Sequence, residues 1–427
     1  MPEFHRPRGT RDFTPEEMRF RRWAEKRMRD AIASIGYQEI STPTFENTDL
    51  FVAKSGKQVL EQIYEFQDKG GRSLSLRPEL TAPVMRFYHS DLRNYPKPLR
   101  ISYFGNCFRY ERPQKGRYRE FWQMGLEYIG KRTPLALAEV VDAAVSSLEA
   151  VGLKEFVVRV GHVALLSSIL KGYGADPDKD RDLMIAIDKK DEDGIRSYIQ
   201  ERFESDPEDL IRLVTTTYGP DEYREVLSKL RAEHTGIEDK VDEIGRVMEF
   251  LKDSYAGIRL DPSISRGLDY YDGMVFEIDA SNLGAEKQIC GGGAYSLSSV
   301  FGSEVEGIGF GLGFDRILVA LEEEKPPRAE KGRVYLIAMG EEAERRAISL
   351  ARSVRSYGLV CIVETSGRGF KKSISSAVSG ECSHLLVLGE EELERKMVSV
   401  KNLETKEQIK VPLEDLENHL LDIVEEK

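Results

Sequence analysis

The sequence predicts an α+β domain with an antiparallel sheet and flanking helices, a helical insertion within that domain, and a C-terminal α/β domain. Three observations lead to this prediction. Residues 99–124 read as strand, long loop and strand, residues 171–256 are acidic and patterned as helices, and short apolar runs alternate with helical segments after residue 333. A chain of 427 residues has room for two or three domains of ordinary size.

Composition narrows the classes of protein to which this chain can belong. It has 40% hydrophobic and 9% aromatic residues, and no apolar stretch approaches the length that crosses a membrane. The start, MPEFHRPRGT, does not read as a signal peptide. The four cysteines are far apart with no CxxC pair, which argues against a disulfide framework or a structural zinc site and favours the cytoplasm. The net charge of −12 argues against a protein that binds nucleic acid over its whole surface, so any RNA contact should be a local basic patch.

The first regular element is a helix with a strong start signal. Thr14 and Glu17 form a capping box, with Pro15 at the first helical position. Gly36 should stop the helix, and the strand that follows should end at Pro43. Apolar residues at helical spacing predict one buried stripe, formed by Phe20, Ala24, Met28, Ala31, Ile32 and Ile35.

The most informative segment runs from Phe108 to Gln123. An apolar strand leads into it and an alternating strand leaves it, so it is the long loop of a hairpin. Between Arg109 and Arg119 it carries five basic residues and one acid. A hairpin tip needs no such cations, whereas a loop that holds phosphates does, because guanidinium groups bind phosphate oxygens in pairs.

An Arg, a Glu and a Phe of this hairpin could hold the three parts of ATP. Arg109 and Glu111 are two positions apart and would share a strand face, with Phe121 on the returning strand. Arg109 would then meet the α-phosphate, Glu111 the adenine amino group and Phe121 the ring face. The alternative is a solvated basic hairpin with an internal ion pair.

A second candidate pair precedes the hairpin, in the segment 76–81. Glu79 and Thr81 are two positions apart, so in an extended chain they would point the same way. A carboxylate and a hydroxyl together suit the ammonium group of a ligand. The alternative is an exposed Glu and Thr at the end of a strand.

Three glycine-bearing segments complete the candidate site. Ser265-Arg266-Gly267 precedes a strand, where glycine lets the backbone and a guanidinium approach a ligand closely. The run 290–295 holds three successive glycines ahead of Ala294 and Tyr295, but it lacks the Lys-Ser/Thr ending of a P-loop. Segment 307–317 reads as a glycine-spaced strand that enters a helix carrying Arg316. Taken alone, each has the alternative of close packing and surface ion pairs.

Charge marks residues 171–256 as a separate module. This stretch holds 14 Lys and Arg against 23 Asp and Glu, a balance of −9, so the rest of the chain has only −3. Its apolar pattern predicts helices near 180–190, 207–215, 221–232 and 238–254. The domain that it interrupts would then comprise residues 1–170 and 257–325.

A charged, proline-bearing segment separates a C-terminal domain from the rest. Residues 326–332 read as the linker and residues 333–427 as an α/β domain. The expected strands lie at 334–338, 359–363, 384–388 and 397–400, and the expected helices at 341–356, 370–379 and 413–424.

Taken together, these motifs resemble class II aminoacyl-tRNA synthetases. The strand that ends at Pro43, the Phe-Arg-x-Glu loop and the Gly-Leu-Gly-x-x-Arg segment are similar to the three signature motifs of that class. The segments 265–271 and 291–295 resemble the two signatures of the histidyl-tRNA synthetase family. The resemblance spans nearly the whole chain and includes the C-terminal anticodon-binding domain of class IIa enzymes.

The resemblance implies an ATP-dependent ligase that activates histidine and transfers it to tRNA(His), with Mg²⁺ bound to ATP. It makes Arg109 and Arg266 catalytic, and Arg266 would bridge the histidine carboxylate and the α-phosphate. The implied ATP-binding residues are Arg109, Glu111, Arg117, Phe121 and Arg316. The implied histidine-binding residues are Glu79, Thr81, Gln123, Glu127, Arg266, Tyr270, Tyr271 and Tyr295. The implied tRNA-binding residues are Arg112, Gln114, Lys115, Arg119, Lys371 and Lys372.

One departure from the family limits these implications. Ala294 and Ser296 stand where many members carry Arg and Asp, so only backbone packing and Tyr295 are assigned there. Two alternatives are a histidine-biosynthesis regulatory subunit, which lacks the anticodon domain, and a class IIa synthetase for another amino acid. The Arg266 to Tyr271 signature argues against the second alternative.

Assembly and tRNA contact are also implied by the resemblance. The helix 14–35 and the strand that Pro43 ends resemble the family's dimer interface, so a homodimer without membrane association is expected in the cytoplasm. The insertion should contact tRNA through a minority basic face, for which the candidates are Lys189, Lys190, Arg224 and Arg231.

Overall fold

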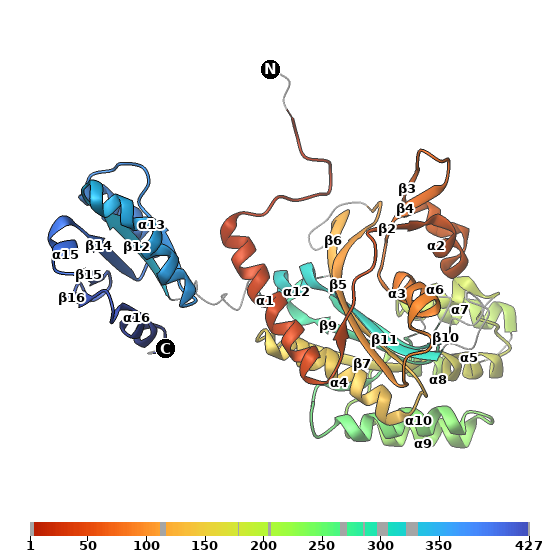
Figure 1. Ribbon diagram of the computed structural model, residues 1–427. Helices are drawn as coiled ribbons and strands as arrows, with labels where there is room; N and C mark the ends of the chain where they lie inside the picture. The colour runs from red at the N-terminus through yellow and green to blue at the C-terminus, as the bar shows by residue number, and fades with distance from the viewer. Residues whose placement is uncertain are drawn as a thin grey trace. The chain divides into compact units, whose positions relative to one another are not determined.

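The chain folds into two compact units, residues 1–326 and 327–427, each of which is treated by itself (Figure 1). The computed structural model describes residues 4–111, 117–177, 179–203, 206–264, 271–284, 287–296, 306–321 and 332–425. Within these ranges, no helix is long and apolar enough to cross a membrane.

Helix α1, Pro15–Ser34, begins as the sequence predicts. The Thr14 hydroxyl accepts the backbone N–H of Glu17, and the Glu17 carboxylate accepts the backbone N–H of Thr14, so the capping box is complete. Gly36 adopts φ of +95°, a conformation that favours glycine, and the helix ends before it. The predicted apolar stripe is buried at Ala24, Met28 and Ile32.

The first unit is built on an eight-stranded sheet in the order β1-β5-β6-β11-β10-β9-β7-β8. The six central strands are antiparallel, as predicted, but both edge pairs are parallel. Parallel pairing needs a long connection. Three small strands with short helices lie between β1 and β5 along the chain, and six helices lie between β7 and β8. The strands are β1 Gln38–Glu39, β5 Leu99–Phe108, β6 Glu120–Ile129, β7 Phe156–His162, β8 Ile258–Leu260, β9 Tyr271–Ala280, β10 Gln288–Ser296 and β11 Glu306–Gly313.

A three-stranded sheet in the order β2-β4-β3 lies between β1 and β5 along the chain. Its strands are β2 Phe45–Asn47, β3 Tyr64–Gln67 and β4 Ser73–Leu76. The helices around it are α2 Thr48–Ser55, the 3₁₀ turn Lys57–Glu61, α3 Thr81–Phe87 and the π turn Tyr88–Leu92. Pro43 lies between β1 and β2, outside both strands.

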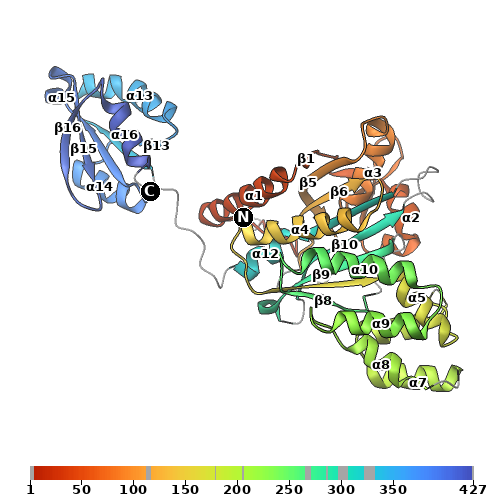
Figure 2. The same ribbon diagram turned by 90° about the horizontal axis from the view of Figure 1, so that it is seen from below.

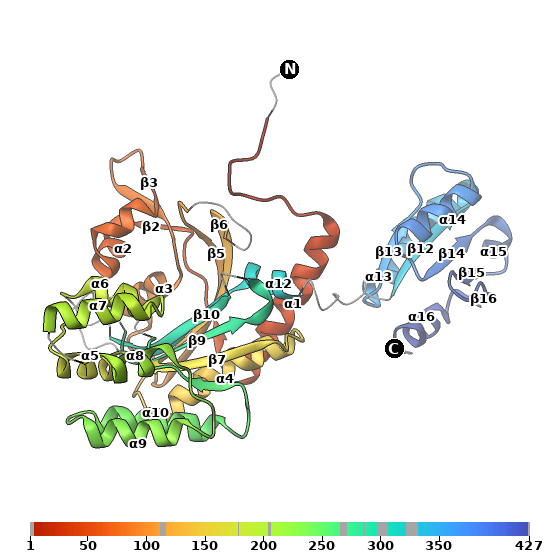
Figure 3. The same cartoon turned by 180° about the vertical axis from the view of Figure 1, so that it is seen from behind.

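Helices α1, α4 and α10 cover one face of the large sheet, with α4 between the other two (Figure 2). Seen from behind, the helices of the insertion lie at the end of the sheet that carries β7 and β9 (Figure 3). The helices from α4 to the end of the insertion are α4 Pro134–Ala150, α5 Val163–Gly172, α6 Arg181–Asp188, α7 Glu192–Phe203, α8 Glu208–Thr215, α9 Tyr223–Glu233 and α10 Glu238–Leu251. Helix α12, Phe314–Leu321, follows β11.

The insertion differs from expectation in one helix. Helix α7 was not predicted, because it is short of apolar residues and contains Gly194, although Ile195 and Ile199 are fully buried. Residues of the insertion and of the large sheet share one continuous hydrophobic core. By contacts, the insertion is therefore part of the first unit, and a separate functional role for residues 171–256 stays a prediction.

The second unit is an α/β domain whose sheet has the order β13-β12-β14-β15-β16. Its strands are β12 Arg333–Ala338, β13 Val360–Val363, β14 His384–Leu388, β15 Met397–Asn402 and β16 Gln408–Pro412. Its helices are α13 Glu341–Ser356, α14 Phe370–Ser379, α15 Glu390–Glu394 and α16 Leu416–Glu425. The four predicted strands and three predicted helices are present. The sequence missed α15 and β16, since both are short and largely exposed.

Candidate active site

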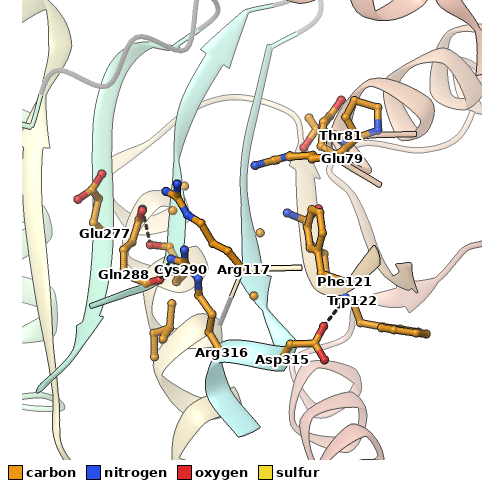
Figure 4. Close-up of a pocket in the computed structure, with 18 of the residues that line it drawn as sticks. Glu79, Thr81, Arg117, Phe121, Trp122, Glu277, Gln288, Cys290, Asp315 and Arg316 are labelled. Atoms are coloured by element: carbon orange, nitrogen blue, oxygen red, sulfur yellow. Dashed lines mark hydrogen bonds between the residues drawn. The ribbon is translucent and has the colours of Figure 1, made fainter. Parts of the chain in front are cut away.

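A cavity of about 500 Å³ opens at the large sheet (Figure 4). It gathers side chains from the β5–β6 hairpin, the start of α3, strands β9–β11 and the start of α12. In Figure 4, Arg316, Gln288 and Cys290 lie on one side of the view and Glu79 and Thr81 on the other. Residues far apart in the sequence therefore contribute to one polar cavity.

All five predicted ATP-binding residues line this cavity. The Arg109 guanidinium lies 5.2 Å from the centre of the Phe121 ring, and its Nε donates to the Pro78 carbonyl at 2.9 Å. Glu111 lies between two arginines, 3.9 Å from an Arg109 nitrogen and 3.7 Å from the Arg117 Nε. An anion, a flat ring and several cations thus meet in one place.

Arg109 and Glu111 were expected to share one face of a strand, but the backbone that holds them lies beyond the end of β5. Strand β5 ends at Phe108, so Arg109 and Glu111 lie beyond it. The Arg109 N–H donates to the Arg119 carbonyl at 3.0 Å, and the Arg119 guanidinium lies 4.1 Å from the Tyr110 ring centre. The predicted tRNA-binding residues Arg112, Gln114 and Lys115 lie outside the described residues.

The prediction of an extended chain at Glu79 and Thr81 was wrong. Thr81 begins helix α3, and the Glu79 carboxylate accepts the backbone N–H groups of Thr81 at 2.7 Å and Ala82 at 3.0 Å. The first N–H groups of a helix have no partner within the helix, and a carboxylate satisfies them well. Both residues still line the cavity, although the predicted local geometry was wrong.

Glu127 lies beneath the cavity and is only 1% exposed. Its carboxylate accepts the hydroxyl of Tyr295 at 2.6 Å and that of Tyr103 at 3.1 Å. Burial, together with the Glu127 charge, raises the pKa of Tyr103 well above its usual value. Tyr103 and Tyr271 line the cavity above, and the rings of Tyr271 and Tyr295 are 6.3 Å apart.

The glycines of β11 make room for these side chains. Gly309 lies directly opposite Glu127 in the β6–β11 pairing, and a methyl group there would overlap the Glu127 carboxylate and come within 2.6 Å of the Leu126 carbonyl. A methyl group at Gly307 would lie 2.6 Å from the Tyr295 ring. These alternate glycines therefore leave room for the Glu127 and Tyr295 side chains. From the sequence, the same glycines could be interpreted only as sites of close packing.

Gln123, also predicted to bind histidine, lies at the same face of β6. It lines the cavity, and its side-chain oxygen lies 3.3 Å from the Cys107 sulfur, which donates to it. Burial raises the pKa of Cys107 to about 12, so this thiol stays protonated and can act as a donor. The remaining two predicted residues, Arg266 and Tyr270, lie outside the described residues.

Asp315 is the principal residue that the sequence analysis missed. It is 3% exposed and accepts hydrogen bonds from Arg11 at 2.6 Å, Arg21 at 2.7 Å and the backbone N–H of Trp122 at 2.7 Å. Figure 4 shows the last of these bonds. Its position directly before Arg316 was the available signal, but no pattern in the sequence links it to the N-terminal segment.

Comparisons with known proteins identify the family. The family model for histidyl-tRNA synthetase matches residues 9–317, and the model for an anticodon binding domain matches residues 333–423. A histidine–tRNA ligase from Archaeoglobus fulgidus is 44% identical over 416 residues, which cover 97% of this chain and 98% of that protein. The chain belongs to the histidyl-tRNA synthetase family.

Solved structures of the family agree in fold. Histidyl-tRNA synthetase of S. aureus is 27% identical, with a TM-score of 0.71 over 98% of this chain and all of that chain. A Bacillus halodurans protein described as an ATP phosphoribosyltransferase regulatory subunit/histidyl-tRNA synthetase is 26% identical, with a TM-score of 0.76 over 91% of this chain and 99% of that one. Residues 333–423 match an anticodon binding domain, and we expected a histidine-biosynthesis regulatory subunit to lack that domain.

A second charged cluster, also missed by the sequence analysis, joins the insertion to the large sheet of the first unit. Arg159 binds Asp261 at 2.9 Å, Glu277 at 2.6 Å and Asp279 at 2.9 Å, and Lys190 of the insertion binds Asp261 at 3.2 Å. Glu277 lines the cavity. Arg159 thus connects a carboxylate of the cavity to the turn that precedes the 265–271 signature.

The predicted basic face of the insertion is largely paired within the chain. Besides Lys190, Arg224 forms an ion pair with Glu249 and Arg231 with Asp242. Reversing these charges would break ion pairs as well as any tRNA contact. The contact itself stays a prediction, and Lys189, which is exposed, is the remaining candidate among the four.

Proposed function

We propose that this chain is a histidine–tRNA ligase, which uses ATP to form histidyl-adenylate and pyrophosphate and then transfers histidine to the 3′ end of tRNA(His). The observation that carries the proposal is the arrangement of one cavity. Cations and an aromatic ring suited to ATP line it, and a buried carboxylate lies beneath it. Family membership supports the same conclusion.

For the activation step, this cavity supplies charge and position. The histidine carboxylate attacks the α-phosphorus of ATP, a bond forms between them, and pyrophosphate leaves with the electrons of the broken P–O bond. No side chain must gain or lose a proton for this step, so catalysis depends on alignment and on cancelling negative charge. Arg109 would bind the α-phosphate, and Arg117 and Arg316 the γ-phosphate. We also propose that Arg266 bridges the two reacting groups.

The base of ATP would bind at the other groups of the hairpin. Phe121 would stack on the adenine ring, and the Glu111 carboxylate would accept its amino group. The position of Arg109 over the Phe121 ring supports this assignment, since it brings a phosphate-binding cation close to a surface on which a ring can stack.

Histidine would be recognised by groups that match its imidazole. A neutral imidazole has one donor and one acceptor nitrogen. Glu127 would accept from the N–H, and the Tyr271 hydroxyl would donate to the other nitrogen. A carboxylate can accept about four hydrogen bonds, so Glu127 can bind an imidazole N–H while it retains Tyr103 and Tyr295. Glu79, Thr81 and Gln123 would take the ammonium group, and Tyr270 and Tyr295 would complete the pocket.

The proposal includes Mg²⁺ as part of the ATP substrate. Among the described residues, no group of three or more His, Cys, Asp or Glu side chains is placed to hold a metal ion. The carboxylates of the cavity are Glu79, Glu111, Glu277 and Asp315, and each already faces an arginine or backbone N–H groups. Mg²⁺ would then be held mainly by the β- and γ-phosphates.

The second unit would bind the anticodon of tRNA. Lys371 and Lys372 are exposed in the first turn of α14, where the helix N-terminus also favours phosphate. Residues 1–325 contain every group assigned to ATP and histidine, so the proposal gives activation to one unit and anticodon binding to the other. Residues 326–332 would then be the linker between them, and Arg119 would contact tRNA from the first unit.

Two assays on the full chain test this function. Pyrophosphate exchange, measured with each amino acid in turn, should depend on histidine, and tRNA(His) should then be charged. Changing Lys371 and Lys372 to Glu should raise the KM for tRNA and leave exchange unchanged, because neither residue belongs to the cavity. Exchange that is absent with histidine, or equal with another amino acid, would contradict the proposal.

We also propose a cytoplasmic homodimer. Helix α1 and the strand β1, which lies at the edge of the large sheet, resemble the family's dimer interface. Sedimentation at micromolar concentration should give a mass near twice the 48.5 kDa of one chain. A monomer with full activity would contradict this part of the proposal.

A further inference from the structure

The N-terminal segment ahead of α1 lies against the hairpin that carries the phosphate-binding arginines. The Gly9 carbonyl accepts the backbone N–H of Arg119 at 2.9 Å. Four residues on, the Phe13 ring packs edge-on against Trp122, with ring centres 5.8 Å apart. Between these contacts lies Arg11. The segment therefore contacts the returning side of the hairpin at several successive points.

Arg11 contacts two elements of the cavity wall at once. Its guanidinium lies 3.3 Å from the centre of the Tyr118 ring, and its Nη2 binds the Asp315 carboxylate at 2.6 Å. Tyr118 and Asp315 both line the cavity, whereas Arg11 does not. Tyr118 is the direct neighbour of Arg117, and Asp315 is the direct neighbour of Arg316.

We infer that Arg11 is a positioning residue for the triphosphate of ATP: it joins the end of the hairpin loop to the start of α12 and so sets the distance between Arg117 and Arg316. This inference rests on the proposed function, which gives those two arginines to the γ-phosphate. Among the described residues, the pairing of β11 with β6 reaches only to Gly313 and Gln123, so it does not connect Arg316 with Arg117. A guanidinium can make both contacts because it is flat and also presents several N–H donors.

The neighbouring Arg21 shows what a purely structural role looks like here. It is 6% exposed and binds the same carboxylate, but its guanidinium is surrounded by Phe13, Trp122 and Phe314 at 4.1–5.2 Å. Arg11 is further out, with 19% of its side chain exposed, and its guanidinium lies 3.3 Å from the Tyr118 ring centre as well as 5.0 Å from that of Phe13. Removing Arg21 should therefore weaken the fold, whereas changing Arg11 should chiefly move the cavity wall.

The test is Arg11→Lys in the full chain, with Arg8→Lys on the same segment as the matched control. Lysine keeps the charge but loses the flat stacking surface and the fork of donors. We expect Arg11→Lys to raise the KM for ATP in pyrophosphate exchange by roughly 5- to 30-fold, the range for one stacked and charged contact. The KM for histidine and the unfolding temperature should stay close to those of the unchanged protein. Arg8 is exposed, and its change should alter none of these values.

A double variant decides whether Arg11 acts through Tyr118. If it does, Arg11→Lys combined with Tyr118→Leu should raise the KM for ATP no more than the larger single change, because both remove the same contact. Fully additive effects, an unchanged KM for ATP, or parallel rises in both KM values with a lower unfolding temperature would overturn the inference. Failure of the proposed function is seen separately, as absent histidine-dependent exchange in the unchanged protein.

Discussion

Replacing Arg109 with Ala should slow histidine-dependent pyrophosphate exchange by roughly 10²- to 10³-fold, the usual loss for one charged donor at a transition state. Negative charge grows around the α-phosphorus as the histidine carboxylate attacks. Arg109 lies in the cavity beside Phe121, where its guanidinium can oppose that charge. The measurement is kcat for exchange at saturating histidine and ATP.

Two controls separate catalysis from structure in this experiment. Arg109→Lys keeps a positive charge but not the paired donors, so its kcat should fall between those of the unchanged protein and Arg109→Ala. Because Arg109 also binds the Pro78 carbonyl, the unfolding temperature should be measured for both variants. Exchange at full speed in a folded Arg109→Ala protein would rule out the assigned role.

Replacing Glu127 with Ala should raise the KM for histidine by roughly 100-fold or more, with far less effect on the KM for ATP. The change would remove the proposed acceptor for imidazole, and it also leaves the hydroxyls of Tyr103 and Tyr295 without this partner. Glu127 is buried beneath the part of the cavity that we assign to histidine, so ATP should be little affected. Equal effects on both substrates would mean that Glu127 is structural.

A second variant reaches the same carboxylate by another route. Gly309→Ala places a methyl group in the space that Glu127 occupies, so it should also raise the KM for histidine. Gly311→Ala is the matched control for the strand itself, because its nearest neighbour would be the Gln123 amide at 3.9 Å. For stability, we expect a clear loss with Gly309→Ala and a small one with Gly311→Ala. Equal unfolding temperatures in the two variants would contradict the steric argument.

Elements with strong local signals were predicted well. The capping box of α1, the β5–β6 hairpin and most of the second unit follow from caps, glycines and apolar spacing, which act over a few neighbouring residues. Helix α7 was missed because it is short of apolar residues, and helix α15 and strand β16 because both are short and largely exposed. The parallel pairing of β1 with β5 was missed for another reason: it joins distant segments and leaves no local pattern.

The class of protein and the residue types of its candidate site could be predicted from the sequence. Cations beside an acid in the hairpin loop, the glycine-spaced strand and Arg316 were all visible, since chemistry that handles phosphate needs these groups within short motifs. Their order along the chain was enough for the resemblance to the synthetase family, which the comparisons bear out.

Most of the contacts that support these groups could not be predicted, because they come from packing between distant elements. The Glu79 carboxylate binds the first turn of α3, Gly309 makes room for Glu127, and Asp315 joins Arg11 to Trp122. Arg11 and Asp315 are 304 positions apart in the sequence, so no periodicity could pair them. A buried carboxylate must find donors wherever the fold supplies them, and that choice depends on which elements pack together in space.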